Sequence, residues 1–184
     1  VLFSLNKKDD RILTDAQIVK VQSAMERVYN GEFIADLRPP EYRKPLPQFD
    51  PQQVNHYVHA RLLDSDFWEV ATDARIGEMA AKLLQTRSVS LIEDQLLAKP
   101  PSSKPIAMHQ DYSYWKFSPI PQLTTCWIAL TDMTLDMSPI QFIRGSHRWM
   151  TARTPTKFAS GDEGDIMEVA DEVRPPGAAV EIVT

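Results

Sequence analysis

The sequence predicts an antiparallel β-sandwich or barrel with helices packed outside it, folded as one domain of 184 residues. Three observations predict this fold. Apolar residues recur at helical spacing through residues 1–86, and they then occur in short runs of branched and aromatic residues through 87–184. No helical pattern separates those runs, so neighbouring strands should be antiparallel. The 14 prolines cluster between the expected elements, where they interrupt helices and strands.

The helical part holds four expected helices, and two of them have clear start signals. Thr14 and Gln17 have the form of a capping box, in which each side chain covers a free amide at the helix start. Asp50 followed by Pro51 combines a capping residue with a proline suited to the first turn. The helices are expected at residues 15–30, 51–62, 67–71 and 76–84.

The strand region supplies the residues that could carry chemistry. Strands are expected at residues 89–99, 106–112, 123–130, 140–143 and 178–183. Because residues two apart on a strand point to the same face, His109 and Asp111 should project an imidazole and a carboxylate together. Such a pair is two thirds of the facial triad that holds non-haem iron(II), although zinc or manganese can use similar ligands.

The spacing of this pair does not by itself establish a site. Four histidines and fifteen aspartates would give about 0.3 His-x-Asp pairs by chance in a chain of this length. The setting is more informative, because Tyr112, Tyr114 and Trp115 follow the pair. An aromatic wall beside a metal would exclude water from it.

Charge and composition argue against several kinds of partner. The net charge of -5 and the pI near 5.4 disfavour nucleic-acid binding. No apolar run approaches the roughly 20 residues that a membrane-spanning helix needs. Cys126, the only cysteine, is typical of a small buried apolar residue, which favours a reducing, cytoplasmic location. The sequence does not predict an oligomeric state.

Four blocks carry a family resemblance: Leu-Leu-Ala-Lys-Pro-Pro at 96–101, Met-His-Gln-Asp-Tyr-Ser-Tyr-Trp at 108–115, Thr-Cys-Trp-Ile-Ala-Leu at 125–130 and Gln-Phe-Ile-Arg-Gly-Ser-His-Arg at 141–148. In this order they resemble the phytanoyl-CoA dioxygenase family of iron(II)- and 2-oxoglutarate-dependent oxygenases. The resemblance implies a mainly β fold, a double-stranded β-helix or cupin-like jelly roll with the N-terminal helices packed outside. It also implies that 2-oxoglutarate and O2 yield succinate and CO2 while a small organic substrate is hydroxylated.

The resemblance assigns roles to four residues. His109 and Asp111 match the first two iron ligands of the family. Asp111 favours hydroxylation over halogenation, because related halogenases carry a small residue at that position. Gln95 and Trp127 match positions that contact 2-oxoglutarate, although Trp127 is equally typical of a core tryptophan. The resemblance does not identify the substrate.

Two functional residues of the family have no match in this chain: a distal histidine that is the third iron ligand, and an arginine that binds the far carboxylate of 2-oxoglutarate. We expect both to follow Thr184, so that residues 87–184 form only the first part of the jelly roll. His147 is a weaker candidate ligand because the family has a turn there, and His56 and His59 fall on a predicted helix. The alternative function is a catalytically inactive jelly-roll module for binding or scaffolding.

Two segments have less defined expectations. Residues 157–176 carry six acidic side chains and are expected to form a solvated loop, which could act as a lid. The turn at Met137-Ser138-Pro139 lacks a glycine that many relatives have there, so it is expected to take a different form.

Overall fold

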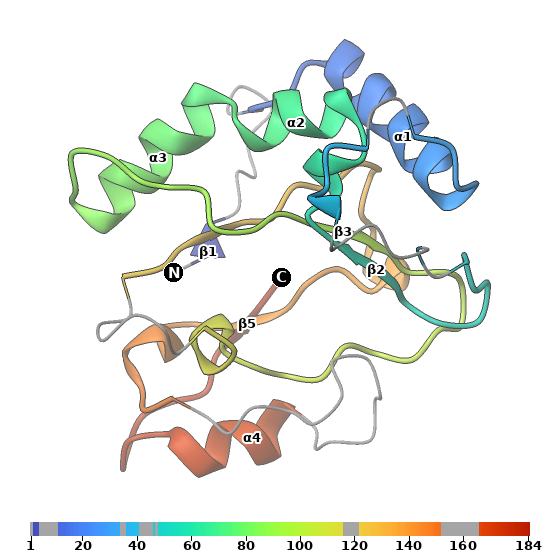
Figure 1. Ribbon diagram of the computed structural model, residues 1–184. Helices are drawn as coiled ribbons and strands as arrows, with labels where there is room; N and C mark the ends of the chain where they lie inside the picture. The colour runs from blue at the N-terminus through green and yellow to red at the C-terminus, as the bar shows by residue number, and fades with distance from the viewer. Residues whose placement is uncertain are drawn as a thin grey trace. The chain divides into compact units, whose positions relative to one another are not determined.

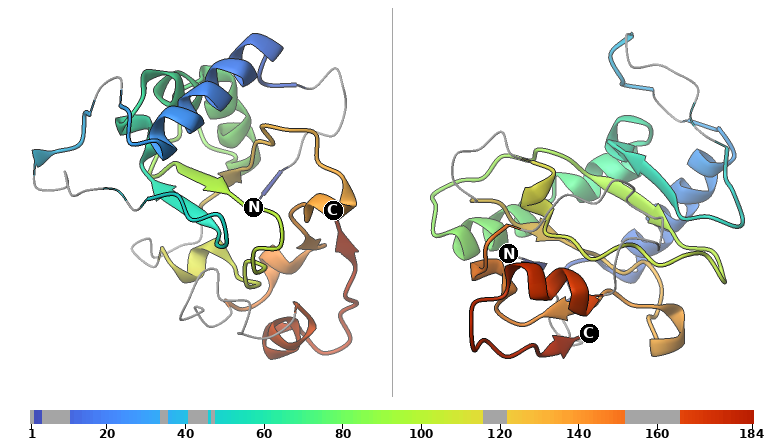
Figure 2. Two further views of the ribbon diagram at one scale, coloured as in Figure 1. Left: turned by 90° about the vertical axis from the view of Figure 1, so that its right-hand side faces the viewer. Right: turned by 90° about the horizontal axis from the view of Figure 1, so that it is seen from below.

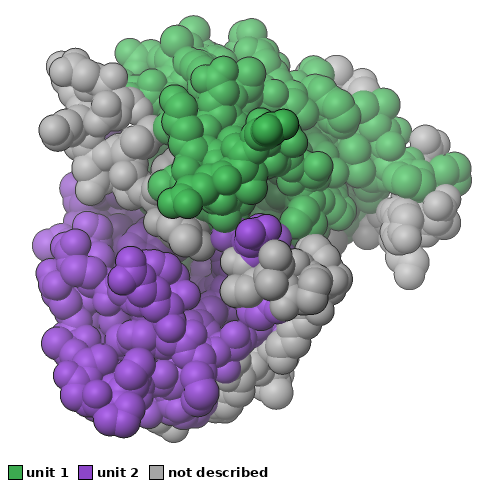
Figure 3. All heavy atoms as spheres, turned by 90° about the vertical axis from the view of Figure 1, so that its left-hand side faces the viewer, with its two compact units in different colours: residues 1–100, 124–131 green, residues 101–123, 132–184 purple. Residues whose placement is uncertain are grey.

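The computed structural model describes residues 2–3, 11–33, 36–40, 46, 48–115, 122–151 and 166–184 (Figure 1). The chain forms two compact units, coloured separately in Figure 3. Unit 1 comprises residues 1–100 and 124–131, and unit 2 comprises residues 101–123 and 132–184. None of the helices in the described part of the chain combines the length and apolar character that a membrane crossing requires.

Three helices of unit 1 lie close to where the sequence predicts them. They are α1 (Asp15–Tyr29), α2 (Ser65–Ala71) and α3 (Ala74–Leu84). The capping box of α1 is confirmed, since Thr14 Oγ1 accepts a hydrogen bond from the Gln17 amide at 3.2 Å and Gln17 Oε1 accepts one from the Thr14 amide at 3.0 Å. Asp64 and Asp73 cap α2 and α3 through their carboxylates, which accept from backbone amides in the first turn.

The predicted helix at residues 51–62 is wrong. Asn55–Val58 form strand β2, and Ala60–Leu62 form a short 3₁₀ helix after it. β2 pairs antiparallel with β3 (Gln95–Ala98), and the two strands run side by side in both views of Figure 2. Asp50 closes a turn instead of capping a helix, because its amide donates to Asn55 Oδ1 and its carbonyl accepts from Asn55 Nδ2, both at 2.8 Å.

The core of unit 1 forms where α1 and α2 pack against the β2–β3 ribbon (Figure 1). Its buried members are Val21, Ala24, Val28, Tyr57, Ala60, Leu63, Phe67 and Leu96. The Asp64 carboxylate is fully buried beside α1 and accepts a hydrogen bond from Arg27 Nε at 2.9 Å. A buried carboxylate needs such partners because it has lost its hydration, so Arg27 and Asp64 tie α1 to the start of α2.

Unit 2 contains strands β5 (Phe142–Ile143) and β6 (Ile182–Val183), which pair antiparallel, and helix α4 (Ile166–Val173). The prediction of a loop at 157–176 is wrong for residues 166–173, which form α4. Residues 157–165 lie outside the described part of the chain. Val169 and Val173 are buried one helical turn apart, and Met108 and Trp149 pack against them. These two apolar positions, four residues apart, pack α4 against Met108 and Trp149 of the same unit.

The described strands are shorter than predicted. β4 (Thr125–Cys126) pairs parallel with β1 (Leu2–Phe3). Together with the β2–β3 and β5–β6 pairs, this gives three two-stranded sheets among the described strands. The double-stranded β-helix therefore stays a prediction. Cys126 is half-buried, and burial raises the pKa of its thiol. Ser138 takes a left-handed backbone with φ of 54°, the conformation that glycine would adopt most easily.

Candidate metal centre

His109 and Asp111 do not lie on a strand, so the strand predicted at 106–112 is wrong. Residues 103–110 are irregular, and a short 3₁₀ helix begins at Asp111 and ends at Ser113. Pro105 has no amide to give to a ladder, and the left-handed Ser102 (φ 63°) turns the chain just before it. Gln110 is nonetheless extended, with φ of -111° and ψ of 128°, and an extended residue places its two neighbours on the same side.

The two side chains converge in spite of the irregular backbone. His109 Nε2 lies 3.4 Å from Asp111 Oδ1, with 20% of the His109 side chain and 38% of the Asp111 side chain exposed. The other ring nitrogen, Nδ1, lies 2.8 Å from the Ala107 carbonyl oxygen. A carbonyl can only accept a hydrogen bond, so this contact requires the proton on Nδ1 and leaves Nε2 able to bind a metal.

A positive charge between the two side chains would stabilise this arrangement. If the imidazole is neutral with its proton on Nδ1, the Nε2 lone pair faces a carboxylate oxygen, and two acceptors repel each other. A second proton on the ring or a metal ion bound by both atoms removes the repulsion. Ligand atoms at right angles on an ion about 2.1 Å away are roughly 3 Å apart, so the observed separation is close to that of a shared ion. The pair therefore fits two positions of an iron(II) site.

The same contacts set the electrostatics of His109. Burial lowers the pKa of its imidazole, but the hydrogen bonds with Asp111 and the Ala107 carbonyl and the negative charge of Asp111 outweigh burial, so the pKa is raised. The Tyr114 ring meets the imidazole edge-on, with ring centroids 5.5 Å apart and an interplanar angle of 76°. One member of the predicted aromatic wall thus touches the candidate ligand.

Gln95 and Trp127 lie in unit 1, whereas His109 and Asp111 lie in unit 2. Gln95 begins β3 and donates from Nε2 to Glu93 Oε1 at 2.5 Å. Its side chain also hydrogen-bonds with His56 of β2. Burial lowers the pKa of His56, and the Gln95 hydrogen bond and the Glu93 charge oppose this effect. Trp127 follows β4 and is half-buried. The structure thus brings together the predicted iron ligands within one unit and locates the other two residues within the other.

The other histidines do not complete the pair. His147 is exposed in the 3₁₀ helix Ser146–Arg148, and His56 and His59 belong to β2 and the turn after it in unit 1. Across the residues that the structure describes, no group of three His, Cys, Asp or Glu side chains could hold a metal ion. A metal site that used His109 and Asp111 would therefore require at least one more donor.

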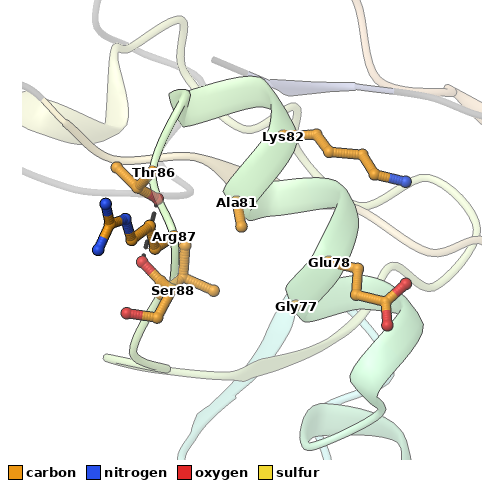
Figure 4. A pocket seen from close by; sticks show the side chains of 8 residues that line it. Gly77, Glu78, Ala81, Lys82, Thr86, Arg87 and Ser88 are labelled. Atoms are coloured by element: carbon orange, nitrogen blue, oxygen red, sulfur yellow. Dashed lines mark hydrogen bonds between the residues drawn. The ribbon is translucent and has the colours of Figure 1, made fainter.

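A pocket of about 400 Å³ in unit 1 lies between α3 and the segment after it (Figure 4). Its described lining includes none of the four predicted site residues. Glu78 and Lys82 point away from the Thr86–Ser88 segment, where Thr86 Oγ1 donates to the Ser88 carbonyl. The pocket does not gather converging polar groups of the kind that orient a ligand.

Comparison with protein families gives a match to the model for phytanoyl-CoA dioxygenase over residues 8–178. The chain belongs to this family. Proteins of the phytanoyl-CoA dioxygenase family generally have a cupin or jelly-roll fold and use iron(II) and 2-oxoglutarate. Searches of curated proteins and of solved structures find no match. The family match confirms the resemblance inferred from four short blocks, and it also extends over the N-terminal helices.

Sequence reasoning missed the polar contacts that surround the pair in this family member. The Ala107 carbonyl accepts from His109, and Gln110 Nε2 donates to the Ser146 carbonyl at 3.2 Å. Gln110 and Ser146 both occur in the blocks that resemble the family, but they are 36 residues apart. Local periodicity carries no information about a contact of that range, so only the blocks themselves could have drawn attention to these residues.

Proposed function

We propose that this chain forms one oxygenase domain, spanning residues 1–184, that hydroxylates a small organic molecule with iron(II) and 2-oxoglutarate. His109 and Asp111 are the iron ligands that it contributes. The observation that carries this proposal is the approach of His109 Nε2 to Asp111 Oδ1 at 3.4 Å, with Nδ1 bonded to the Ala107 carbonyl. This is the tautomer and orientation that a metal-binding histidine requires.

The residues of the chain prepare the site for its cofactor. Iron(II), when bound, supplies adjacent positions at which 2-oxoglutarate and O2 react together. His109 presents Nε2 because the Ala107 carbonyl holds the other side of the ring, and Asp111 contributes negative charge that favours a cation. The Tyr114 ring lies against the imidazole in a T-shaped arrangement and so reduces the access of water to it.

Gln95 and Trp127 are proposed to contact 2-oxoglutarate. The amide of Gln95 and the indole N–H of Trp127 are hydrogen-bond donors, which suit a dicarboxylate. Their assignment rests on their positions in and beside the blocks shared with the family, and they lie in unit 1. We also propose a reducing, cytoplasmic location, because the single Cys126 is half-buried and has no partner cysteine in the chain.

Anaerobic titration of the full-length protein with iron(II), followed by an assay of succinate formation, tests the proposal. We expect wild-type protein to bind iron(II) and to convert 2-oxoglutarate to succinate. His109→Ala should abolish both, because it removes one iron ligand. His147→Ala is the matched control, since it removes an exposed histidine of the same unit and should leave both unchanged.

Two results would contradict the proposal. Wild-type protein that binds no iron(II) would instead fit a module without oxygenase chemistry. Iron(II) binding that persists at wild-type affinity in His109→Ala would show that the metal is held elsewhere. Circular dichroism of each variant distinguishes loss of a ligand from loss of the fold.

A further inference from the structure

The middle residue of the His109-Gln110-Asp111 sequence makes a contact of its own. Because Gln110 is extended, its side chain points away from the side that His109 and Asp111 share. Its Nε2 donates to the Ser146 carbonyl oxygen at 3.2 Å, and the contact is partly buried. Partial burial strengthens such a bond relative to one in water.

The turn that accepts this hydrogen bond is itself well defined. Gly145 adopts a left-handed backbone with φ of 80°, which a residue with a side chain would resist. The amides of Arg148 and Trp149 donate to the carbonyls of Gly145 and Ser146 at 3.1 and 3.0 Å. Before the turn, the Arg144 amide donates to the Glu181 carbonyl at 2.9 Å, which continues the β5–β6 pairing. The Ser146 carbonyl is therefore a fixed acceptor.

His109 is thus held on both sides along the chain. Met108, on one side, packs against Val169 and Val173 of α4, and Trp149 at the end of the same turn packs there as well. Gln110, on the other side, bonds to the beginning of that turn. The segment at 103–110 has neither helical nor strand structure, so side-chain contacts must supply the order that a ladder would otherwise provide.

We propose that Gln110 is a positioning residue for the metal pair: its hydrogen bond to Ser146 fixes the backbone between His109 and Asp111 and so holds the two ligand atoms at a separation that one ion can bridge. The metal part of this inference rests on the proposed function. Partners that orient metal ligands typically account for a tenfold to hundredfold change in metal affinity.

The test uses two isosteric variants of the full-length protein. Gln110→Met removes the donor, and Gln110→Glu replaces it by a carboxylate that would repel the Ser146 carbonyl. Gln141→Met is the matched control, because Gln141 is an exposed glutamine of the same unit. Two readouts are measured for each protein: Co(II) affinity, from its visible absorption, and the motion of the His109 ring in metal-free protein, from ¹³C relaxation of labelled histidine at constant pH.

We expect both Gln110 variants to bind Co(II) at least about tenfold more weakly than wild type. Both should show a more mobile His109 ring, while Gln141→Met matches wild type in both readouts. Urea midpoints should change equally little in all three variants, which separates positioning from loss of stability.

The two proposals fail in different ways. Ring motion that stays at the wild-type value in both Gln110 variants overturns the positioning role, whatever the Co(II) result. Wild-type protein that binds no Co(II), together with increased ring motion in the Gln110 variants, would retain the positioning role and contradict the metal site. If wild type binds Co(II) and the Gln110 variants bind it as tightly as Gln141→Met does, the inference is also overturned.

Discussion

In unit 1, α1 buries Val21, Ala24 and Val28 against a paired strand ribbon, whereas in unit 2 the segment carrying His109 has no regular structure and is held by individual side-chain contacts. The first arrangement uses apolar area, which is large and tolerant of small shifts. The second uses directed hydrogen bonds, such as the one from Gln110 to Ser146, which contribute little net stability but define geometry. Apolar burial in unit 1 is therefore suited to stability, and directed hydrogen bonds in unit 2 are suited to fixing the geometry of the His109–Asp111 pair.

The buried ion pair of unit 1 is expected to give the largest stability effect. Arg27→Ala should lower the free energy of unfolding by about 3 kcal/mol, because the fully buried Asp64 would lose its main cationic partner. Urea unfolding followed by circular dichroism measures this loss. Arg11→Ala is the control, since Arg11 pairs with Asp15 at the surface and its removal should change stability little.

A loss that stayed within 1 kcal/mol of wild type would contradict this expectation, because the buried Asp64 would then not depend on its cationic partner. The comparison between the two units would be sharpened if the variant, under conditions where it remains folded, bound Co(II) as wild type does. That outcome would place stability and metal binding in separate sets of residues.

Contacts with 2-oxoglutarate should give an intermediate effect. Gln95→Met and Trp127→Phe each remove a donor, and a hydrogen bond to a charged group contributes about 1.5 kcal/mol, so the KM for 2-oxoglutarate should rise roughly tenfold with kcat nearly unchanged. Steady-state succinate formation measures this, with Gln52→Met as the exposed control in unit 1. An unchanged KM in both variants would show that Gln95 and Trp127 do not contact 2-oxoglutarate, which would leave the proposed site residues only in unit 2.

The capping box of α1 should give the smallest effect. Thr14→Ala removes the side-chain acceptor for the Gln17 amide and should cost about 1 kcal/mol of unfolding free energy. Thr86→Ala, which removes a hydroxyl bonded to the Ser88 carbonyl outside any helix, should cost less. Thermal and urea unfolding measure both. Equal losses in the two variants would show that the cap of α1 contributes no more than an ordinary surface hydrogen bond.

The elements that the sequence predicted correctly have local causes. α1 follows from the Thr14 cap and its apolar stripe, and α2 and α3 follow from apolar residues at helical spacing after an aspartate. The wrong helix at residues 51–62 has a distant cause. Asp50-Pro51 reads as a helix start, yet β2 forms because it pairs with β3 some forty residues later. Asn55 and Tyr57 of β2 are buried, but Asn-His-Tyr-Val does not alternate between apolar and polar residues, so local periodicity carried no signal of that pairing.

For the candidate site, the sequence by itself determined which residues to consider. The identities of His109 and Asp111, and the blocks around them, indicated the family and its chemistry, because donor atoms and short motifs are properties of the residues themselves. Only the tertiary structure decided how they are arranged: an irregular segment instead of a strand, an imidazole oriented by the Ala107 carbonyl, and a Gln110 side chain that donates to the Ser146 carbonyl across 36 residues. Such contacts depend on how distant segments of the chain meet, and residue spacing along the chain does not record that.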